Sequence, residues 1–151
     1  EKGRVPWQGQ GQDRWAVEIS TIDWYGRVTY MVFFAGCNFR CPFCQNSGML
    51  TFESGKEVDL SYVEGRIEES AFLLDAVGVT GGEPTLQPDA LAELFRWSRE
   101  KGLKTSLNTN ASQPAVVRRL LDEKLVSYVA MDVKGPLSDP ERLSGFPRRQ
   151  R

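Results

Sequence analysis

The sequence predicts an α/β fold organised around a parallel sheet. Runs of β-branched and aromatic residues alternate with longer segments in which apolar residues recur at helical spacing. Their order, β, α, β, α, β, α, β, is typical of parallel strands joined by right-handed crossovers. An unusual polar cluster directly follows each of the four expected strands, which predicts that all four clusters lie at one edge of the sheet.

The amino-terminal part is expected to lead into the first strong strand. Residues 1–14 are rich in Gly and Gln without a clear period, so we expect a flexible lead-in. Residues 15–22 alternate loosely and predict a short strand, and residues 23–26 supply a turn. The run 28–34 is almost continuously apolar, as in strands that are covered on both faces.

Three helices and three further strands are expected after a loop or weak strand at 48–59. The first helix should begin at a capping box of Ser61 and Glu64, and Ser112 should cap the third. Gly102 fits the position just after the second helix. In chain order, the elements are helix 61–74, strand 76–80, helix 88–101, strand 103–108, helix 114–124 and strand 126–133.

Composition excludes several classes of protein. The 151 residues are 40% hydrophobic and carry a net charge of −1, so the chain has no bulk attraction to nucleic acid or to an anionic membrane. No apolar run reaches the roughly 18 residues of a membrane span, and residues 1–13 are too polar for a secretory signal. We therefore expect a cytoplasmic protein that binds neither nucleic acid nor membrane. Histidine is absent, which excludes a Ser-His-Asp triad and mixed Cys/His zinc sites.

One domain is expected over residues 15–137, followed by a polar tail at 138–151 that is solvated or begins a missing portion. A closed barrel of eight β/α units takes about 200 residues or more, whereas four strands are evident here. The last of them would otherwise be an exposed edge. We therefore expect a partial TIM-like (β/α) barrel of parallel strands, truncated after about four β/α units.

The three cysteines of the chain, Cys37, Cys41 and Cys44, lie within eight positions after the first strong strand. An odd number at this spacing favours a metal centre in a reducing compartment over disulfides. Thiolates select zinc, copper(I) or iron–sulfur clusters. Structural zinc would need a fourth ligand from a carboxylate or a partner chain. Three cysteines also suit a [4Fe–4S] cluster in which one iron stays open to a small molecule.

The other clusters follow the second, third and fourth strands. They are Gly81-Gly82-Glu83-Pro84, Asn108-Thr109-Asn110 and Asp132-Val133-Lys134. Taken singly, a Gly-Gly pair is a turn, charged residues are solvated, and Asn-Thr-Asn is ordinary loop chemistry. Because the carboxyl edge of a parallel sheet is where ligands bind, their shared placement predicts one site.

Two of these motifs resemble those of a known family. The loop 36–46, Gly-Cys-Asn-Phe-Arg-Cys-Pro-Phe-Cys-Gln-Asn, is similar to the cluster loop of the radical S-adenosylmethionine (SAM) enzymes, and 81–84 is similar to their second motif. Residues 130–134 also resemble the glycyl-radical-enzyme activases, especially the type that serves anaerobic ribonucleotide reductase. The resemblance runs from about 19 to 137.

The resemblance implies an activity and its cofactors. A [4Fe–4S] cluster would reduce SAM to a 5′-deoxyadenosyl radical, which would take a hydrogen atom from a backbone glycine of a partner enzyme. The electron would come from a flavodoxin- or ferredoxin-type donor. No catalytic side chain beyond the cluster is implied.

The resemblance also implies site residues. Cys37, Cys41 and Cys44 would ligate three irons, and Phe43 would lie near the adenine. The remaining implied residues contact the cofactor, with a monovalent cation bound in some relatives; they are Gly81, Gly82, Glu83 and Pro84 on the methionine ammonium side, and Asn108, Thr109, Asp132 and Lys134 on the ribose and carboxylate side.

Some residues depart from the activase pattern and leave alternatives open. Asn108 stands where activases often have Asp, and Ala111 where they often have Gly, so the cation site is in question. Leu86-Gln87 is shared with the carboxy-deazaguanine synthases, which act on a small molecule. A third alternative is a zinc or iron–sulfur module without catalysis.

Overall fold

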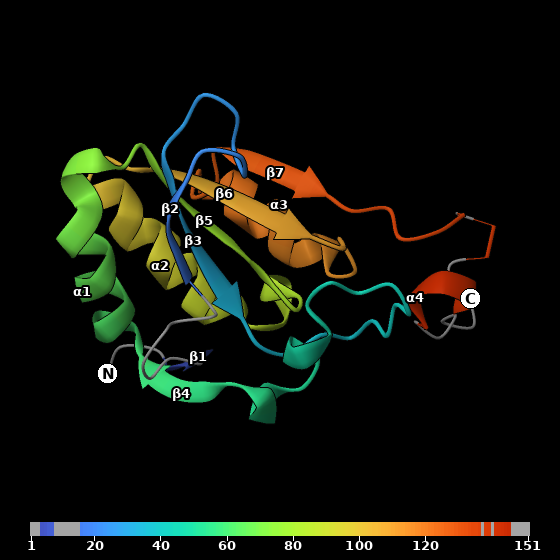
Figure 1. Cartoon of the computed structure of the whole chain (residues 1–151). Helices are drawn as coiled ribbons and strands as arrows, with labels where there is room; N and C mark the ends of the chain where they lie inside the picture. The colour runs from blue at the N-terminus through green and yellow to red at the C-terminus, as the bar shows by residue number, and fades with distance from the viewer. Residues whose placement is uncertain (1–3, 8–15, 137, 140, 146–151) are drawn as a thin grey trace.

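A computed structural model describes residues 4–7, 16–136, 138–139 and 141–145. A five-stranded sheet carries helices on one face, and a two-stranded ribbon lies beside it (Figure 1). The sheet has the strand order β2-β3-β5-β6-β7. Its strands are β2 (Ala16–Ser20), β3 (Thr29–Phe34), β5 (Ala76–Gly81), β6 (Lys104–Thr109) and β7 (Tyr128–Met131).

Four of these strands are parallel, as predicted, and the fifth is not. β3, β5, β6 and β7 pair in parallel, whereas β2 pairs antiparallel with β3. The direction of the strand predicted over 15–22 was not specified by the sequence, and the structure shows it to be antiparallel. The connection 21–28 is a hairpin turn, far shorter than the roughly dozen residues that a parallel crossover needs.

The ribbon was not expected. Within the predicted lead-in, β1 (Arg4–Trp7) pairs antiparallel with β4 (Lys56–Asp59), so these four residues form a regular strand. β4 runs directly into α1 (Leu60–Ser70), whose N-cap is Asp59. The predicted capping box at Ser61 and Glu64 is therefore wrong, because strand pairing carries the chain into the helix before Ser61.

Helices α2 (Pro88–Glu100) and α3 (Pro114–Asp122) match the prediction closely. Each has Pro in its first turn, where the missing N–H costs no hydrogen bond. Gly102 follows α2 with a φ of 79°, as expected of a C′ glycine. Ser112 does not cap α3, whose N-cap is Gln113. The short helices are η1 (Ser47–Met49), η2 (Phe52–Ser54), η3 (Ala71–Leu73), η4 (Pro84–Leu86) and α4 (Glu141–Ser144).

The hydrophobic core lies between the sheet and α1, α2 and α3. Alternate residues of β3, Tyr30, Val32 and Phe34, enter it and are at most 1% exposed. Leu91, Leu94 and Phe95 of α2 cover them with no exposed area. The opposite face of the sheet carries none of these three helices (Figure 1).

The two edges of the sheet are joined across this free face. Trp24, in the turn after β2, stacks on Tyr128 of β7, with ring centroids 5.3 Å apart and planes 20° apart. β2 and β7 are the outermost strands, so the stack links one edge of the sheet to the other. Among the described residues no strand pairs with the outer side of β7.

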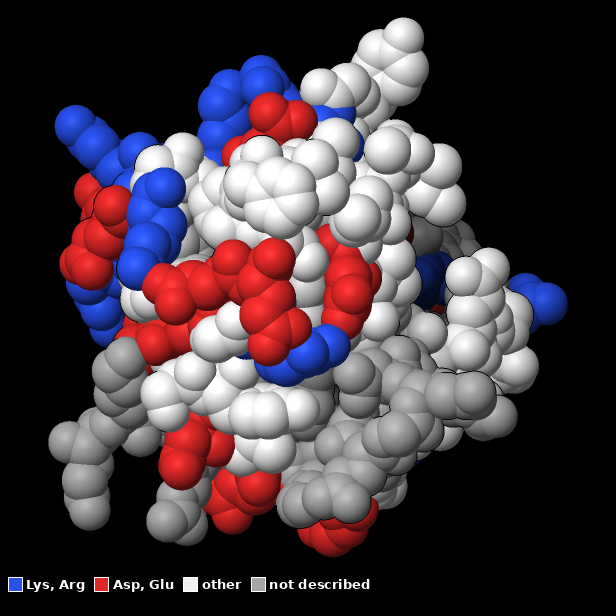
Figure 2. Space-filling model, turned by 60° about the vertical axis from the view of Figure 1, so that its left-hand side comes forward, with Lys and Arg blue, Asp and Glu red and all other residues white. Residues whose placement is uncertain are grey.

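The helical face carries side chains of both charges (Figure 2). Several form ion pairs, such as Arg119 with Asp89 at 3.1 Å and with Glu123 at 2.8 Å. This mixture agrees with the near-neutral net charge. Within the described part of the chain, no helix has the length and apolar character needed to cross a membrane.

Candidate functional site

The four polar clusters meet at one cavity of about 610 Å³ at the carboxyl edge of the parallel strands. Every predicted site residue except Glu83 and Pro84 lines it: Cys37, Cys41, Phe43, Cys44, Gly81, Gly82, Asn108, Thr109, Asp132 and Lys134. Glu83 and Pro84 are buried directly behind it. The four clusters therefore lie together at one edge of the sheet, as their positions directly after successive strands predicted.

The cysteine loop leaves β3 through Gly36 and folds back against η1. The N–H groups of Gly36 and Cys37 donate to the carbonyls of Met49 and Leu50, at 2.8 and 3.0 Å. Gly36 has a φ of 93°, and a Cβ there would lie 2.4 Å from the Phe52 ring. Only glycine fits this corner.

The glycine pair after β5 allows two loops to touch. A Cβ on Gly82 would lie 2.2 Å from the Gly36 carbonyl oxygen, and one on Gly81 would lie 2.4 Å from the Phe34 carbonyl oxygen. The Glu83 N–H donates to the Gly36 carbonyl at 2.8 Å. The pair is therefore more than a turn: it brings the second motif against the cysteine loop.

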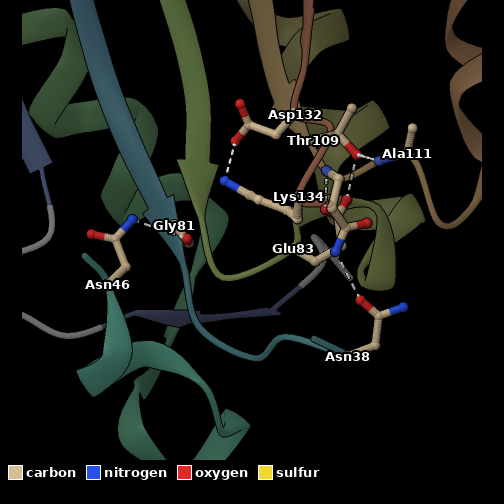
Figure 3. A network of polar contacts seen from close by, with 9 residues as sticks. Asn38, Asn46, Gly81, Glu83, Thr109, Ala111, Asp132 and Lys134 are labelled. Atoms are coloured by element: carbon tan, nitrogen blue, oxygen red, sulfur yellow. Dashed lines mark hydrogen bonds and ion pairs between the residues drawn. The ribbon is translucent and has the colours of Figure 1, made fainter. Parts of the chain in front are cut away.

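Glu83 is the centre of a buried hydrogen-bond network (Figure 3). Its side chain has no exposed area. Oε1 accepts from the Thr85 N–H at 3.1 Å, from the Thr85 hydroxyl, and from the Thr109 hydroxyl at 2.7 Å. Oε2 accepts from the Asn110 N–H at 2.7 Å. The carboxylate thus joins the loop after β5 to the loop after β6, and does not line the cavity.

Two charges of opposite sign lie on the far side of the cavity, after β7. The Lys134 ammonium is 2.7 Å from Asp132 Oδ2, and the Asp132 N–H donates to the Thr109 carbonyl at 2.9 Å. Among the described residues, the Asn108 side chain has no hydrogen-bond partner, so its amide is available to a ligand. This wall can therefore bind a group that carries both charges.

The thiols need a positive partner to become ligands. Burial raises the pKa of Cys37 and Cys41 above the ordinary thiol value, and the Lys134 ammonium opposes this at Cys41. Metal binding requires the thiolate, so the positive charge would come mainly from the bound metal.

The donor set fits a four-iron cluster. Three free thiols from one short loop line the same cavity. Within the described ranges, no three acidic or thiol groups are close enough to hold a single ion. Thiolates are the usual protein ligands of iron–sulfur clusters, so the chemistry of this donor set agrees with a cluster in which one iron has no protein ligand.

Asn38 and Asp23 are among the contributors to the site that sequence reasoning missed. Asn38 and Asn110 form a hydrogen bond between the cysteine loop and the β6 loop, at 3.0 Å. Asp23, in the turn after β2, lines the cavity. The sequence assigned no role to Asn38 and placed Asp23 only in a turn, and no local pattern indicates their partners.

Fold and site together define an α/β protein with a three-thiolate loop and a ligand cavity at the carboxyl edge of parallel strands. The chain belongs to the radical SAM superfamily, whose family model matches residues 31–149. This confirms the resemblance of the two motifs. Proteins of this superfamily use a [4Fe–4S] cluster and SAM, which confirms these two cofactors. The monovalent cation stays a prediction.

Relatives of two functional classes are similar to the chain. A Methanocaldococcus jannaschii protein named "Putative glycyl-radical enzyme activating enzyme MJ1227" is 40% identical over 120 residues, 78% of this chain and 48% of that protein. The 7-carboxy-7-deazaguanine synthase of Hyperthermus butylicus is 39% identical, with the same coverage of 78% and 48%. The pyruvate formate-lyase 1-activating enzyme of Escherichia coli K12 is 31% identical over 76% of this chain and 48% of that enzyme.

The chain spans about half the length of the curated relatives that it matches. Among solved structures, that of QueE from Escherichia coli is similar, with a TM-score of 0.54 and 12% identity over 72% of this chain and 52% of that chain. At this identity the likeness concerns the fold alone. It supports the α/β fold with a mainly parallel sheet.

Proposed function

We propose that the chain is a radical SAM oxidoreductase that activates a glycyl-radical enzyme, such as an anaerobic ribonucleotide reductase. Its electron would come from a flavodoxin- or ferredoxin-type protein. The observation that carries the proposal is the convergence of the thiols, the glycine pair and the Asp132–Lys134 pair on one cavity. A volume of about 610 Å³ lies within the usual range for a small-molecule site.

Cys37, Cys41 and Cys44 would hold three irons of the cluster. When bound, the cluster and SAM supply one-electron reductive cleavage to a 5′-deoxyadenosyl radical. The chain's own residues bind and orient the cofactor and keep water from it. Phe43, which is 54% exposed beside the thiols, offers an apolar ring for the adenine.

Charge complementarity supports the placement of the methionine end of SAM. Lys134 and the Asn108 amide suit its carboxylate. The Gly81 carbonyl, which already accepts from Asn46 at 3.1 Å, keeps a second lone pair for its ammonium. Glu83 would attract this ammonium electrostatically from behind the loop without contacting it, because its oxygens already accept hydrogen bonds from Thr85, Thr109 and Asn110.

The activase assignment has support from names and from one motif. The Methanocaldococcus jannaschii and Escherichia coli relatives carry activating-enzyme names. The sequence over 130–134 also resembles activases. Because the chain spans about half of each relative, the partner is part of the proposal.

A 7-carboxy-7-deazaguanine synthase is the second candidate, favoured by the Hyperthermus butylicus relative at 39% identity. The Leu86-Gln87 pair does not decide between the two. Gln87 Nε2 donates to the Ala35 carbonyl at 2.9 Å and so anchors the entrance to the cysteine loop, a role that serves either reaction.

The test combines the reconstituted chain with a co-purified glycyl-radical enzyme, SAM and an electron donor, without oxygen. We expect 5′-deoxyadenosine and a radical signal on the partner by electron paramagnetic resonance (EPR). A partner whose radical glycine is replaced by alanine is the matched control and should give no signal. Formation of 7-carboxy-7-deazaguanine instead would favour the second candidate. Absence of 5′-deoxyadenosine in every mixture would contradict both.

A further inference from the structure

We propose that Asn38 is a positioning residue that, with Asn110 and Ser112, locks the cysteine loop to the loop after β6. This inference rests on the proposed function, in that the locked loop is the one that would hold the cluster. Asn38 directly follows Cys37, so its side chain acts on the part of the loop that carries this thiol.

Three hydrogen bonds form the lock. Asn38 Nδ2 donates to the Ser112 hydroxyl at 2.8 Å, and Asn38 Oδ1 accepts from Asn110 Nδ2 at 3.0 Å. Asn110 Oδ1 in turn accepts from the Ser112 N–H at 2.9 Å. The two amide side chains, together with the hydroxyl and the backbone N–H of Ser112, close a ring in which each amide both donates and accepts. The Asn38 amide supplies both the donor and the acceptor that this ring uses, whereas a methyl group supplies neither.

The ring is fixed to the rest of the site through Glu83. The Asn110 N–H donates to Glu83 Oε2 at 2.7 Å, and the Ala111 N–H donates to the Thr109 hydroxyl at 3.0 Å. Ala111 has a φ of 56°, which turns the chain toward Ser112 at a cost that these bonds offset. The position of Asn110 is therefore fixed by contacts that do not involve Asn38.

The other flank of the cysteine loop has a separate tie. Asn46 Nδ2 donates to the Gly81 carbonyl at 3.1 Å (Figure 3). One asparagine thus holds the loop at its start and another at its end. Of these two asparagines, only Asn38 contacts the loop after β6. Its loss should therefore increase the mobility of the start of the cysteine loop, around Cys37, more than that of its end.

The first experiment needs no cluster. In the iron-free, reduced chain, the alkylation rate of each cysteine by iodoacetamide is measured by mass spectrometry at one pH. We expect Asn38→Ala to raise the rate at Cys37 by about fivefold, since two hydrogen bonds that hold the loop closed are lost. Gln113→Ala is the matched control, because Gln113 follows Ser112 but its side chain makes no capping hydrogen bond, and it should leave the rate unchanged.

The second experiment follows the reconstituted chain. Asn38→Ala should lose iron to a chelator about tenfold faster and alter the EPR change that SAM produces. Asn38→Asp keeps the acceptor for Asn110, so it should retain iron for at least about half as long as the wild-type chain. Ser112→Ala keeps the same hydrogen bond between residues 38 and 110 and should resemble Asn38→Asp. A general loss of stability would give no such rescue.

The outcomes separate this inference from the function. If Asn38→Ala showed the wild-type alkylation rate at Cys37 and the wild-type rate of iron loss, the proposed role of Asn38 would be contradicted. The proposed function would not be affected by that result. If the wild-type chain took up no cluster, the function would fail, and the alkylation rates would still decide the lock.

Discussion

Replacing Glu83 tests whether this residue is a structural centre as well as a site residue. Its carboxylate is fully buried and accepts four hydrogen bonds, from two groups of Thr85, from Thr109 and from Asn110. Hydrogen bonds to a charged group contribute about 1.5–3 kcal/mol each, or roughly 6–12 kcal/mol for four. Removing the carboxylate also removes a desolvation cost of several kcal/mol. We therefore expect Glu83→Ala to lower the free energy of unfolding by about 3–5 kcal/mol.

The conservative change should have a graded effect. Glu83→Gln keeps one oxygen for Thr85 and Thr109 but places an amide NH₂ against the Asn110 N–H, so the loss should be about 2 kcal/mol. Urea unfolding of the iron-free chain, without oxygen, measures both variants. Glu100→Ala removes an exposed carboxylate of α2 and should change stability by no more than about 0.5 kcal/mol. If Glu83→Ala also stayed within 1 kcal/mol of wild type (an order-of-magnitude limit), the network would not stabilise the fold as described.

Three further substitutions test the packing. Gly82→Ala would place a Cβ 2.2 Å from the Gly36 carbonyl oxygen. We therefore expect the iron content after reconstitution to fall to less than about half of the wild-type value. An iron content equal to that of the wild type would contradict the close approach of the two loops. Gly65→Ala meets nothing within 4 Å in α1 and should raise the free energy of unfolding by about 0.5–1 kcal/mol, whereas a decrease would mean that the helix is not formed there. Trp24→Ala removes the stack on Tyr128 and should lower it by about 1–2 kcal/mol in urea unfolding; no change would show that the stack does not join the sheet edges.

The parallel strands and the position of the site were predictable for one reason. Buried parallel strands are continuous apolar runs, and their carboxyl ends must lie at one edge. The runs at β3 and β5 therefore located the cysteine loop and the glycine pair correctly. What the sequence does not show is which distant segment pairs with a weak run. The pairing of β1 with β4, and with it the true start of α1, depends on contacts between residues about 50 positions apart.

The roles of individual polar residues were harder to predict than their positions. Glu83 was expected to meet the cofactor, yet its oxygens are taken by Thr109 and Asn110, which belong to a different loop. No role was predicted for Asn38, because its partners lie in the distant loop after β6. Ser112 was expected to cap a helix, and instead its hydroxyl accepts from Asn38. Local sequence shows that a side chain can form a hydrogen bond, whereas tertiary structure decides with which group.

The measurement that tests the central claim most directly is EPR of the reconstituted, reduced chain with and without SAM. We expect a [4Fe–4S] signal that changes when SAM is added, because the three cysteines leave one iron open to it. Replacing Cys41 by serine should abolish the signal. A cluster whose signal is indifferent to SAM, or no cluster at all in the wild-type chain, would contradict the assignment of this cavity as a radical SAM site.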